Sequence, residues 1–95
     1  MPVSDIICQA IRNRRVLSFV YKDGARTVEP YILGYDASGT LMLSAVQISG
    51  GSGMGFRTFI VAHLSVITVT QQHFIGVHRD YNPRDRLFTQ VLCQL

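Results

Sequence analysis

Arg57, in the middle of the chain, is a candidate anion-binding residue. Arg57 lies between Phe56 and Phe59, and a bare surface charge is an odd neighbour for two aromatic rings. A guanidinium group presents a planar fork of donors that matches phosphate or carboxylate. The alternative is an ion pair with Glu29 or Asp36, which needs no ligand. Arg57 is nevertheless the first candidate for a binding role.

Two further residues fit the same chemistry. Arg26 begins a predicted strand beside a turn, where it either helps to neutralise an anion next to Arg57 or faces water. Tyr21 ends another predicted strand, and its ring can stack on a nucleobase for about 1–3 kcal/mol. The alternative for Tyr21 is cross-strand packing in the core. Together with Arg57, these residues predict an anion-accepting face.

Catalytic and metal-binding patterns are missing from the sequence. The three histidines, His63, His73 and His78, have neither metal-site spacing nor carboxylates placed to complete a ligand shell. Cys8 and Cys93 fall among apolar residues and form no Cys-x-x-Cys pair, so we expect buried, reduced thiols. No nucleophile stands beside a placed histidine. We therefore predict neither an enzyme nor a bound metal or cofactor.

The glycine-rich stretch over residues 50–55 has the composition of a phosphate-binding loop without its other features. A P-loop ends in Lys-Ser/Thr and leads into a helix, whereas Phe56 begins a predicted strand. We expect a hairpin loop.

Length and composition indicate one small domain. The chain has 95 residues, of which 47% are hydrophobic and 16% charged, with a formal net charge of +3. So few charges on so small a body leave apolar residues outside, which favours a homo-oligomer. No apolar stretch approaches the roughly 20 residues of a membrane span, and no signal peptide is evident. We expect a cytoplasmic protein without a membrane partner.

The spacing of apolar residues predicts the elements that position these groups. A short helix begins with Ser4 as its N-cap and ends near Asn13. Period-two alternation then predicts five strands at about 16–21, 26–35, 41–48, 56–62 and 65–70, with Asp23-Gly24 as a hairpin turn and Pro30 at an edge or bend. Five short strands are too few for two sheets, so a small barrel over about 16–70 is expected. An amphipathic helix should follow over about 82–95, with Asn82 as its cap.

Five segments follow one another in the middle of the chain: Leu17-Ser-Phe-Val-Tyr21, Arg26-Thr-Val-Glu-Pro-Tyr31, Gly39-Thr-Leu-Met-Leu43, Arg57-Thr-Phe59 and His63-Leu64. This order resembles the WYL domain, a small SH3/Sm-like β-barrel of bacterial regulators. The resemblance covers roughly residues 6–74. The chain departs from the pattern where Leu41-Met42-Leu43 replaces the tripeptide that names the family, and where His63 replaces an arginine. No DNA-binding helix-turn-helix precedes the predicted barrel.

The resemblance implies a single-domain sensing module. Such domains generally act in transcription regulation and bind nucleotides, single-stranded nucleic acid or other anionic ligands. By this resemblance, Arg57, Arg26, His63 and Tyr21 form the ligand-binding face, with His63 as a switchable donor at the barrel rim. The alternative is a structural adaptor that assembles through the C-terminal helix or a barrel edge and has no such ligand.

Overall fold

An N-terminal helix, α1 (Val3–Arg12), is the first element of the computed structural model, which describes residues 2–22, 24–51 and 53–95. Its buried residues recur at helical spacing and form one apolar stripe against the sheet: Ile7, Cys8, Ala10 and Ile11. The helix ends at Asn13, as predicted. The predicted cap is wrong, because Pro2, two residues before Ser4, occupies the N-cap position and no side chain caps the helix.

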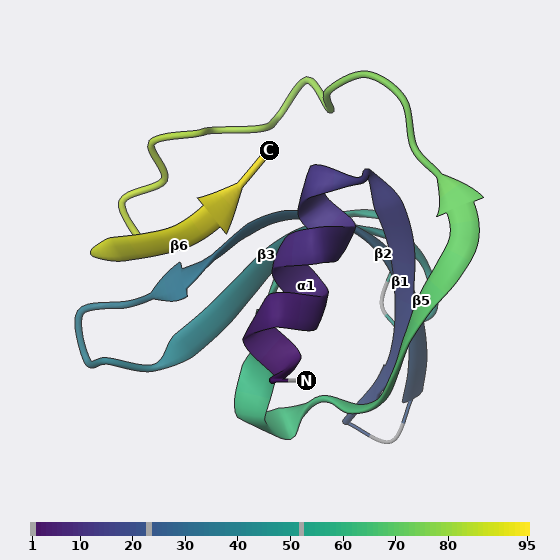
Figure 1. Ribbon diagram of the computed structural model, residues 1–95, viewed down its shortest axis with the longest axis horizontal. Coiled ribbons are helices and arrows are strands. Elements are labelled where there is room, and N and C mark those ends of the chain that lie inside the picture. Colours follow the sequence, from purple (N-terminus) through teal and green to yellow (C-terminus); the bar gives the residue numbers. More distant parts are fainter. Residues whose placement is uncertain (1, 23, 52) are drawn as a thin grey trace.

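In the part of the chain that the structure describes, six strands form one antiparallel sheet (Figure 1). They are β1 (Arg15–Tyr21), β2 (Gly24–Tyr35), β3 (Leu41–Ser49), β4 (Gly55–Ile60), β5 (Ser65–His73) and β6 (Gln90–Gln94). The order is β4-β3-β2-β1-β5, and β6 pairs with β2. The mainly β class, the N-terminal helix and the five predicted strands are confirmed. Asp23 of the predicted hairpin turn and Ser52 of the glycine-rich loop lie outside the described residues.

The predicted closed barrel is wrong, because the sheet is open. A short 3-10 helix, η1 (Val61–His63), connects β4 to β5, but these two strands lie at opposite ends of the strand order. Strand β5 pairs with β1 across two register shifts, and most of its residues are exposed. Turn spacing indicates where strands form, whereas closure also requires the two end strands to meet.

Strand β2 changes its neighbour halfway along one edge. Its first half pairs with β1, from Gly24 to Val28, and its second half pairs with β6, from Ile32 to Tyr35. Pro30 lies between these two stretches, at a register shift in the pairing with β3. Because proline has no backbone N–H, this gap is a suitable place for it. The shift agrees with the predicted edge or bend.

The predicted C-terminal helix is also wrong. Asn82 and Asp85 accept hydrogen bonds from the backbone N–H groups of Arg84 and Leu87, both at 3.0 Å, so each residue closes a single turn. The chain then extends as β6 along the free half of the β2 edge (Figure 1). Gly34 permits this approach, since a Cβ there would collide with the carbonyl oxygen of Gln90. Pairing with β2 overrides the local helical spacing.

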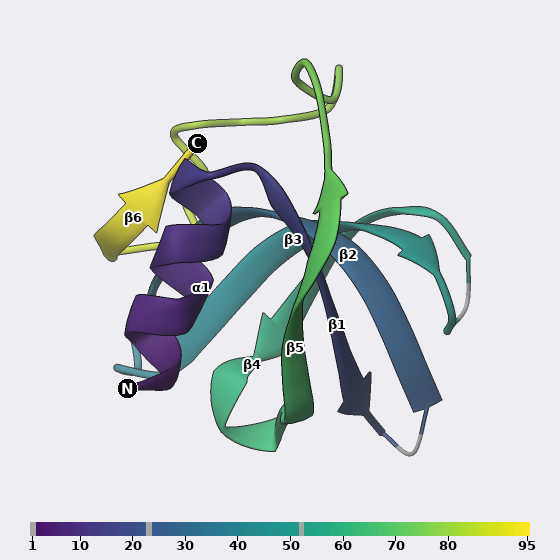
Figure 2. The same ribbon diagram turned by 45° about the vertical axis from the view of Figure 1, so that its right-hand side comes forward.

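Cys8 and Cys93 form a disulfide, so the expectation of reduced thiols is also wrong. The bond joins α1 to β6 across 85 residues of sequence, with the two Cα atoms 5.8 Å apart. Both views show β6 beside α1 (Figures 1 and 2). The apolar neighbours of the two cysteines and the lack of a Cys-x-x-Cys pair gave no sign that they meet in space.

The buried side chains of the described residues form two clusters, one on each face of the sheet. The first cluster packs α1 against β1, β2, β3 and β4, and Leu17 and Phe59 belong to it. The second includes Tyr31 and gathers residues of the segment between β5 and β6, such as Phe74 and Phe88. Within the described residues, no helix is long and apolar enough to cross a membrane.

Candidate ligand-binding site

A hollow of about 480 Å³ lies between the β1–β2 hairpin and edge strand β4. Its lining residues are Tyr21, Lys22, Arg26, Gly51, Arg57, Thr58 and Phe59. Three of the four predicted site residues are therefore brought together: Tyr21, Arg26 and Arg57. Lys22 adds a third cation, and no carboxylate is among the lining residues that the structure describes. We call this site the cationic hollow.

Arg26 is held in place by two hydrogen bonds. Its Nη1 donates to Oε1 of Gln47 at 3.2 Å, and its Nη2 donates to the carbonyl oxygen of Tyr21 at 3.2 Å. Its Nε is buried and has no hydrogen-bond partner among the described residues. Fixing a guanidinium beforehand lowers the entropy lost when a ligand binds.

Gln47, which the sequence analysis missed, organises this side of the hollow. It is fully buried on β3, where its Nε2 donates to the carbonyl oxygens of Gly50 and Gly53. Its amide thereby links the glycine-rich loop to Arg26. Gly51 has φ +61°, and a Cβ there would collide with the Arg26 guanidinium. The sequence signal that could have identified Gln47 is a single glutamine in an apolar strand just before a glycine-rich loop.

Arg57 lies on β4 and is half-buried. Its Nη1 donates to the carbonyl oxygen of Phe56 at 2.9 Å, which leaves other donors for a ligand. Among the described residues, the one contact within ion-pair distance joins His78 and Asp80, so no carboxylate lies that close to Arg57. The alternative pairing with Glu29 or Asp36 is therefore not found in this part of the chain.

Groups other than Arg57 shift the pKa values of the two alternative partners, Glu29 and Asp36. The backbone N–H of Thr40 and the Ser38 hydroxyl stabilise the charged form of Asp36 and lower its pKa. Burial raises the pKa of Glu29, an effect that the nearby charge of His78 partly offsets. The Asp36 carboxylate is therefore engaged within its own turn, away from Arg57.

Tyr21 supports the cations more than it offers a free stacking face. Its side chain is 8% exposed, and its ring packs edge-on against Phe59 with centroids 5.0 Å apart. Lys22 Nζ lies 5.6 Å from the ring centroid and Arg26 Cζ 5.9 Å from it. Cation–π attraction therefore helps to hold both charges at the hollow.

His63 is not brought into this group. It is exposed in η1 and does not line the cationic hollow. Across residues 2–22, 24–51 and 53–95, no group of three or more His, Cys, Asp or Glu side chains is placed to hold a metal ion.

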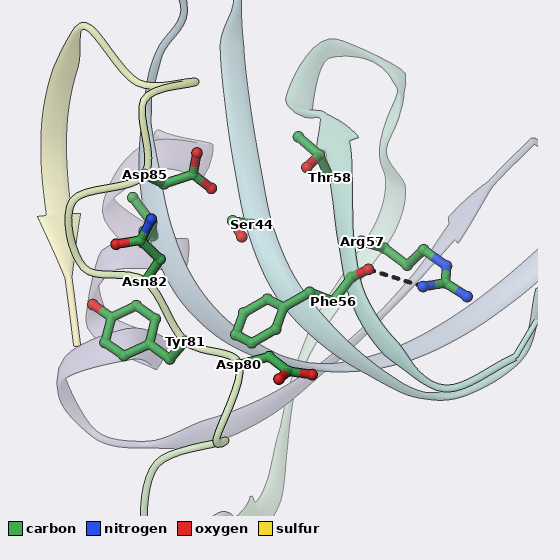
Figure 3. A pocket seen from close by; sticks show the side chains of 9 residues that line it. Ser44, Phe56, Arg57, Thr58, Asp80, Tyr81, Asn82 and Asp85 are labelled. Carbon is green, nitrogen blue, oxygen red and sulfur yellow. Dashed lines mark hydrogen bonds between the residues drawn. The ribbon is translucent and has the colours of Figure 1, made fainter.

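A second hollow, of about 290 Å³, lies between β4 and the segment before β6 (Figure 3). Its lining residues are Ile32, Ser44, Phe56, Arg57, Thr58, Asp80, Tyr81, Asn82 and Asp85. The Arg57 side chain points away from Asp80 and Asp85 in Figure 3, so carboxylates dominate the charge of this site. We call it the acidic hollow. The helical spacing of residues 82–95 gave no sign of this hollow.

The two hollows share Arg57 and Thr58. Successive strand residues point to opposite faces of a sheet, and β4 is an edge strand. Phe56 accordingly belongs with the second cluster, whereas Phe59 belongs to the first. The hollows therefore adjoin each other across β4.

Comparisons with protein families, curated proteins and solved structures found no match to the chain.

Proposed function

We propose that this protein is a non-enzymatic binding module that holds the phosphate of a nucleotide or single-stranded nucleic acid in the cationic hollow. The observation that carries the proposal is the convergence of Lys22, Arg26 and Arg57 on one hollow, with no carboxylate in its described lining. Phosphate oxygens can accept the hydrogen bonds that these three cationic side chains donate.

Electrostatics supports a phosphate ligand. Contacts between cationic side chains and phosphates release counterions, so such binding weakens steeply as salt increases. Gln47 already fixes Arg26, and cation–π contacts place two of the cations beside the Tyr21 ring. Less conformational freedom is then lost on binding than for three unconstrained surface cations.

The resemblance to WYL domains favours the same ligand class and a regulatory role. Arg26 and Arg57 come from its two most specific segments, Arg-x-Val-Glu-Pro and Arg-x-Phe. His63 lies outside the hollow, so we assign the ligand contacts to Arg57, Arg26 and Lys22, with Tyr21 supporting the cations. The effect of Leu41-Met42 in place of the usual aromatic pair stays open.

Anisotropy titration with labelled d(TTTTT) tests the proposal at about 50 mM and about 200 mM salt. We expect binding that weakens at the higher salt. Arg57→Ala should weaken it about tenfold or more, because it removes charge-assisted hydrogen bonds. Arg12→Ala is the matched control, since Arg12 is exposed on α1 and lines neither hollow. Equal affinities of the two variants, or no binding at either salt, would reject the proposal.

A structural adaptor is the second candidate, favoured by exposed apolar side chains. Ile75 is 98% exposed and Val77 is 58% exposed in the segment after β5. Large exposed apolar groups mark contact sites, here with a second copy of the chain. Light scattering on the double variant Ile75→Ser/Val77→Ser tests this candidate. A dimer that dissociates in the variant supports it, and a monomeric parent protein rejects it.

The disulfide bears on the compartment expected from the sequence. Disulfides persist in oxidising surroundings and are rare in the cytosol. A cytoplasmic protein would therefore contain Cys8 and Cys93 as thiols for most of its life. Trapping thiols with an alkylating reagent in intact cells, followed by mass measurement, distinguishes the two states.

A further inference from the structure

We propose that the acidic hollow selects the base of the same ligand, with a preference for guanine. This inference rests on the proposed function, because the cationic hollow must hold a neighbouring phosphate. Phosphate is repelled by Asp80 and Asp85, so the two hollows impose an orientation on the ligand. The phosphate lies on one side of β4 and the base on the other.

The connection between the hollows is the first argument. Arg57 and Thr58 line both sites. The guanidinium of Arg57 points away from the acidic hollow, whereas the Phe56 ring faces it (Figure 3). A strand of nucleotides that crosses the edge at β4 therefore meets a cation and then an aromatic ring, which is the alternation that single-stranded nucleic acid requires.

The second argument is the aromatic wall of the acidic hollow. The rings of Phe56 and Tyr81 are 17° from parallel, with centroids 6.4 Å apart. Tyr81 is fixed at its other end, because its hydroxyl donates to the carbonyl oxygen of Leu95 at 2.9 Å. Ser44, which is 5% exposed, also lines the site and supplies a hydroxyl. Flat apolar walls with a few polar groups suit a planar base.

The chemistry of the carboxylates gives the third argument. An ionised carboxylate only accepts hydrogen bonds. Asp85 already uses Oδ1 to accept from the backbone of Leu87. The Asp80 side chain is 69% exposed, and its Oδ2 lies 3.9 Å from Nδ1 of His78, which accepts a hydrogen bond from the Asp80 backbone N–H. Asp80 therefore has free acceptor capacity on both oxygens.

Among the bases, guanine matches such an acceptor best. Its ring N–H and its exocyclic amine lie side by side and can donate to both oxygens of one carboxylate. Adenine and cytosine present an exocyclic amine beside a ring acceptor. Thymine presents one N–H between two carbonyl oxygens, which a carboxylate repels. The expected order of affinity is guanine first, cytosine and adenine next, and thymine last.

Four labelled oligonucleotides test this inference: d(TTGTT), d(TTATT), d(TTCTT) and d(TTTTT). We expect d(TTGTT) to bind about fivefold or more tighter than d(TTTTT), because the carboxylate is partly exposed to water. Asp80→Asn should remove most of this difference, and Asp85→Asn a smaller part. Asp5→Asn is the matched control, since Asp5 is exposed on α1 and lines neither hollow.

The outcomes separate the inference from the proposed function. Equal affinities for the four oligonucleotides, or a guanine preference that persists in Asp80→Asn, would overturn the inference and leave the proposed function intact. Loss of all binding, or binding that Arg57→Ala does not weaken, would overturn the proposed function. If Asp85→Asn fails to fold, Asp80→Asn still decides, because its side chain is exposed on a loop.

Discussion

The two hollows beside β4 differ in how their residues are brought together. Lys22 and Arg26 flank one hairpin turn, and Arg57 lies on β4, which reaches this hairpin through β3 and β2. The acidic hollow instead depends on residues 80–85, whose position is set by β6 and its disulfide to α1. A site that is built within the sheet should persist when the C-terminal segment is loosened, whereas the acidic hollow should not.

Removal of the disulfide should have the largest effect, and it should affect the two hollows differently. A cross-link over 85 residues restricts the unfolded chain, so Cys8→Ser/Cys93→Ser should lower the free energy of unfolding by about 4–5 kcal/mol. Urea denaturation measures this change. Where the variant remains folded, affinity for d(TTTTT) should stay within about twofold, while the preference for d(TTGTT) declines. An unchanged urea midpoint would contradict the stabilising role of the disulfide. Loss of d(TTTTT) binding by folded protein would contradict the independence of the cationic hollow from the C-terminal segment.

Replacement of Gln47 tests the cationic hollow in the same way. Gln47→Leu leaves the carbonyl oxygens of Gly50 and Gly53 and one donor of Arg26 without partners, so stability should fall by about 2–3 kcal/mol. Binding of d(TTTTT) should weaken as Arg26 loses its support. Gln72→Leu is the control, because Gln72 is exposed on β5 and distant in the sheet from β4. Similar effects of both variants would contradict the role of Gln47.

A smaller effect is expected at Gly51. Gly51→Ala places a side chain at positive φ and against the Arg26 guanidinium, whereas Gly39→Ala meets nothing within 4 Å at a similar φ. Both substitutions incur conformational strain of about 1–2 kcal/mol. Weakened binding of d(TTTTT) is expected in Gly51→Ala alone. Isothermal titration of the pair measures this difference, and equal affinities would show that Gly51 does not shape the hollow.

The smallest expected effect lies outside both hollows, at Asp36. Hydrogen bonds from Thr40 and Ser38 lower the pKa of its carboxyl in the folded protein. The unfolded chain therefore takes up a proton first as the pH falls, and the stability that this group contributes above its ordinary pKa of 3.8 is lost in acid. Thermal melts of Asp36→Asn between pH 6 and pH 3 should depend less on pH than those of the parent. Parallel curves would contradict this assignment.

The sequence was sufficient for features that depend on neighbours along the chain. Alternating apolar residues identified β1 to β5, and the strands bring Arg26 and Arg57, two of the predicted site residues, to one hollow. These features follow from period-two patterning and local turns. Helical spacing located α1 in the same way, because the apolar face of this helix needs only a sheet to pack against.

Features that depend on distant pairing were missed. The helical spacing of residues 82–95 was real, but β2 offered a free edge beyond Pro30, and β6 filled it. The Cys8–Cys93 bond and the acidic hollow both accompany this placement of the C-terminal segment. Gln47 was missed because its partners lie in a loop whose path the sequence does not determine. Whether β4 and β5 meet is likewise a property of the whole sheet.

Backbone amide chemical shifts of labelled protein titrated with d(TTTTT) test the central claim most directly. We expect the largest changes at Lys22, Arg26, Gly51 and Arg57, and none at Gln9 or Ala10, which line a separate hollow beside α1. Changes that cluster at α1 or η1, with none around the cationic hollow, would contradict the account.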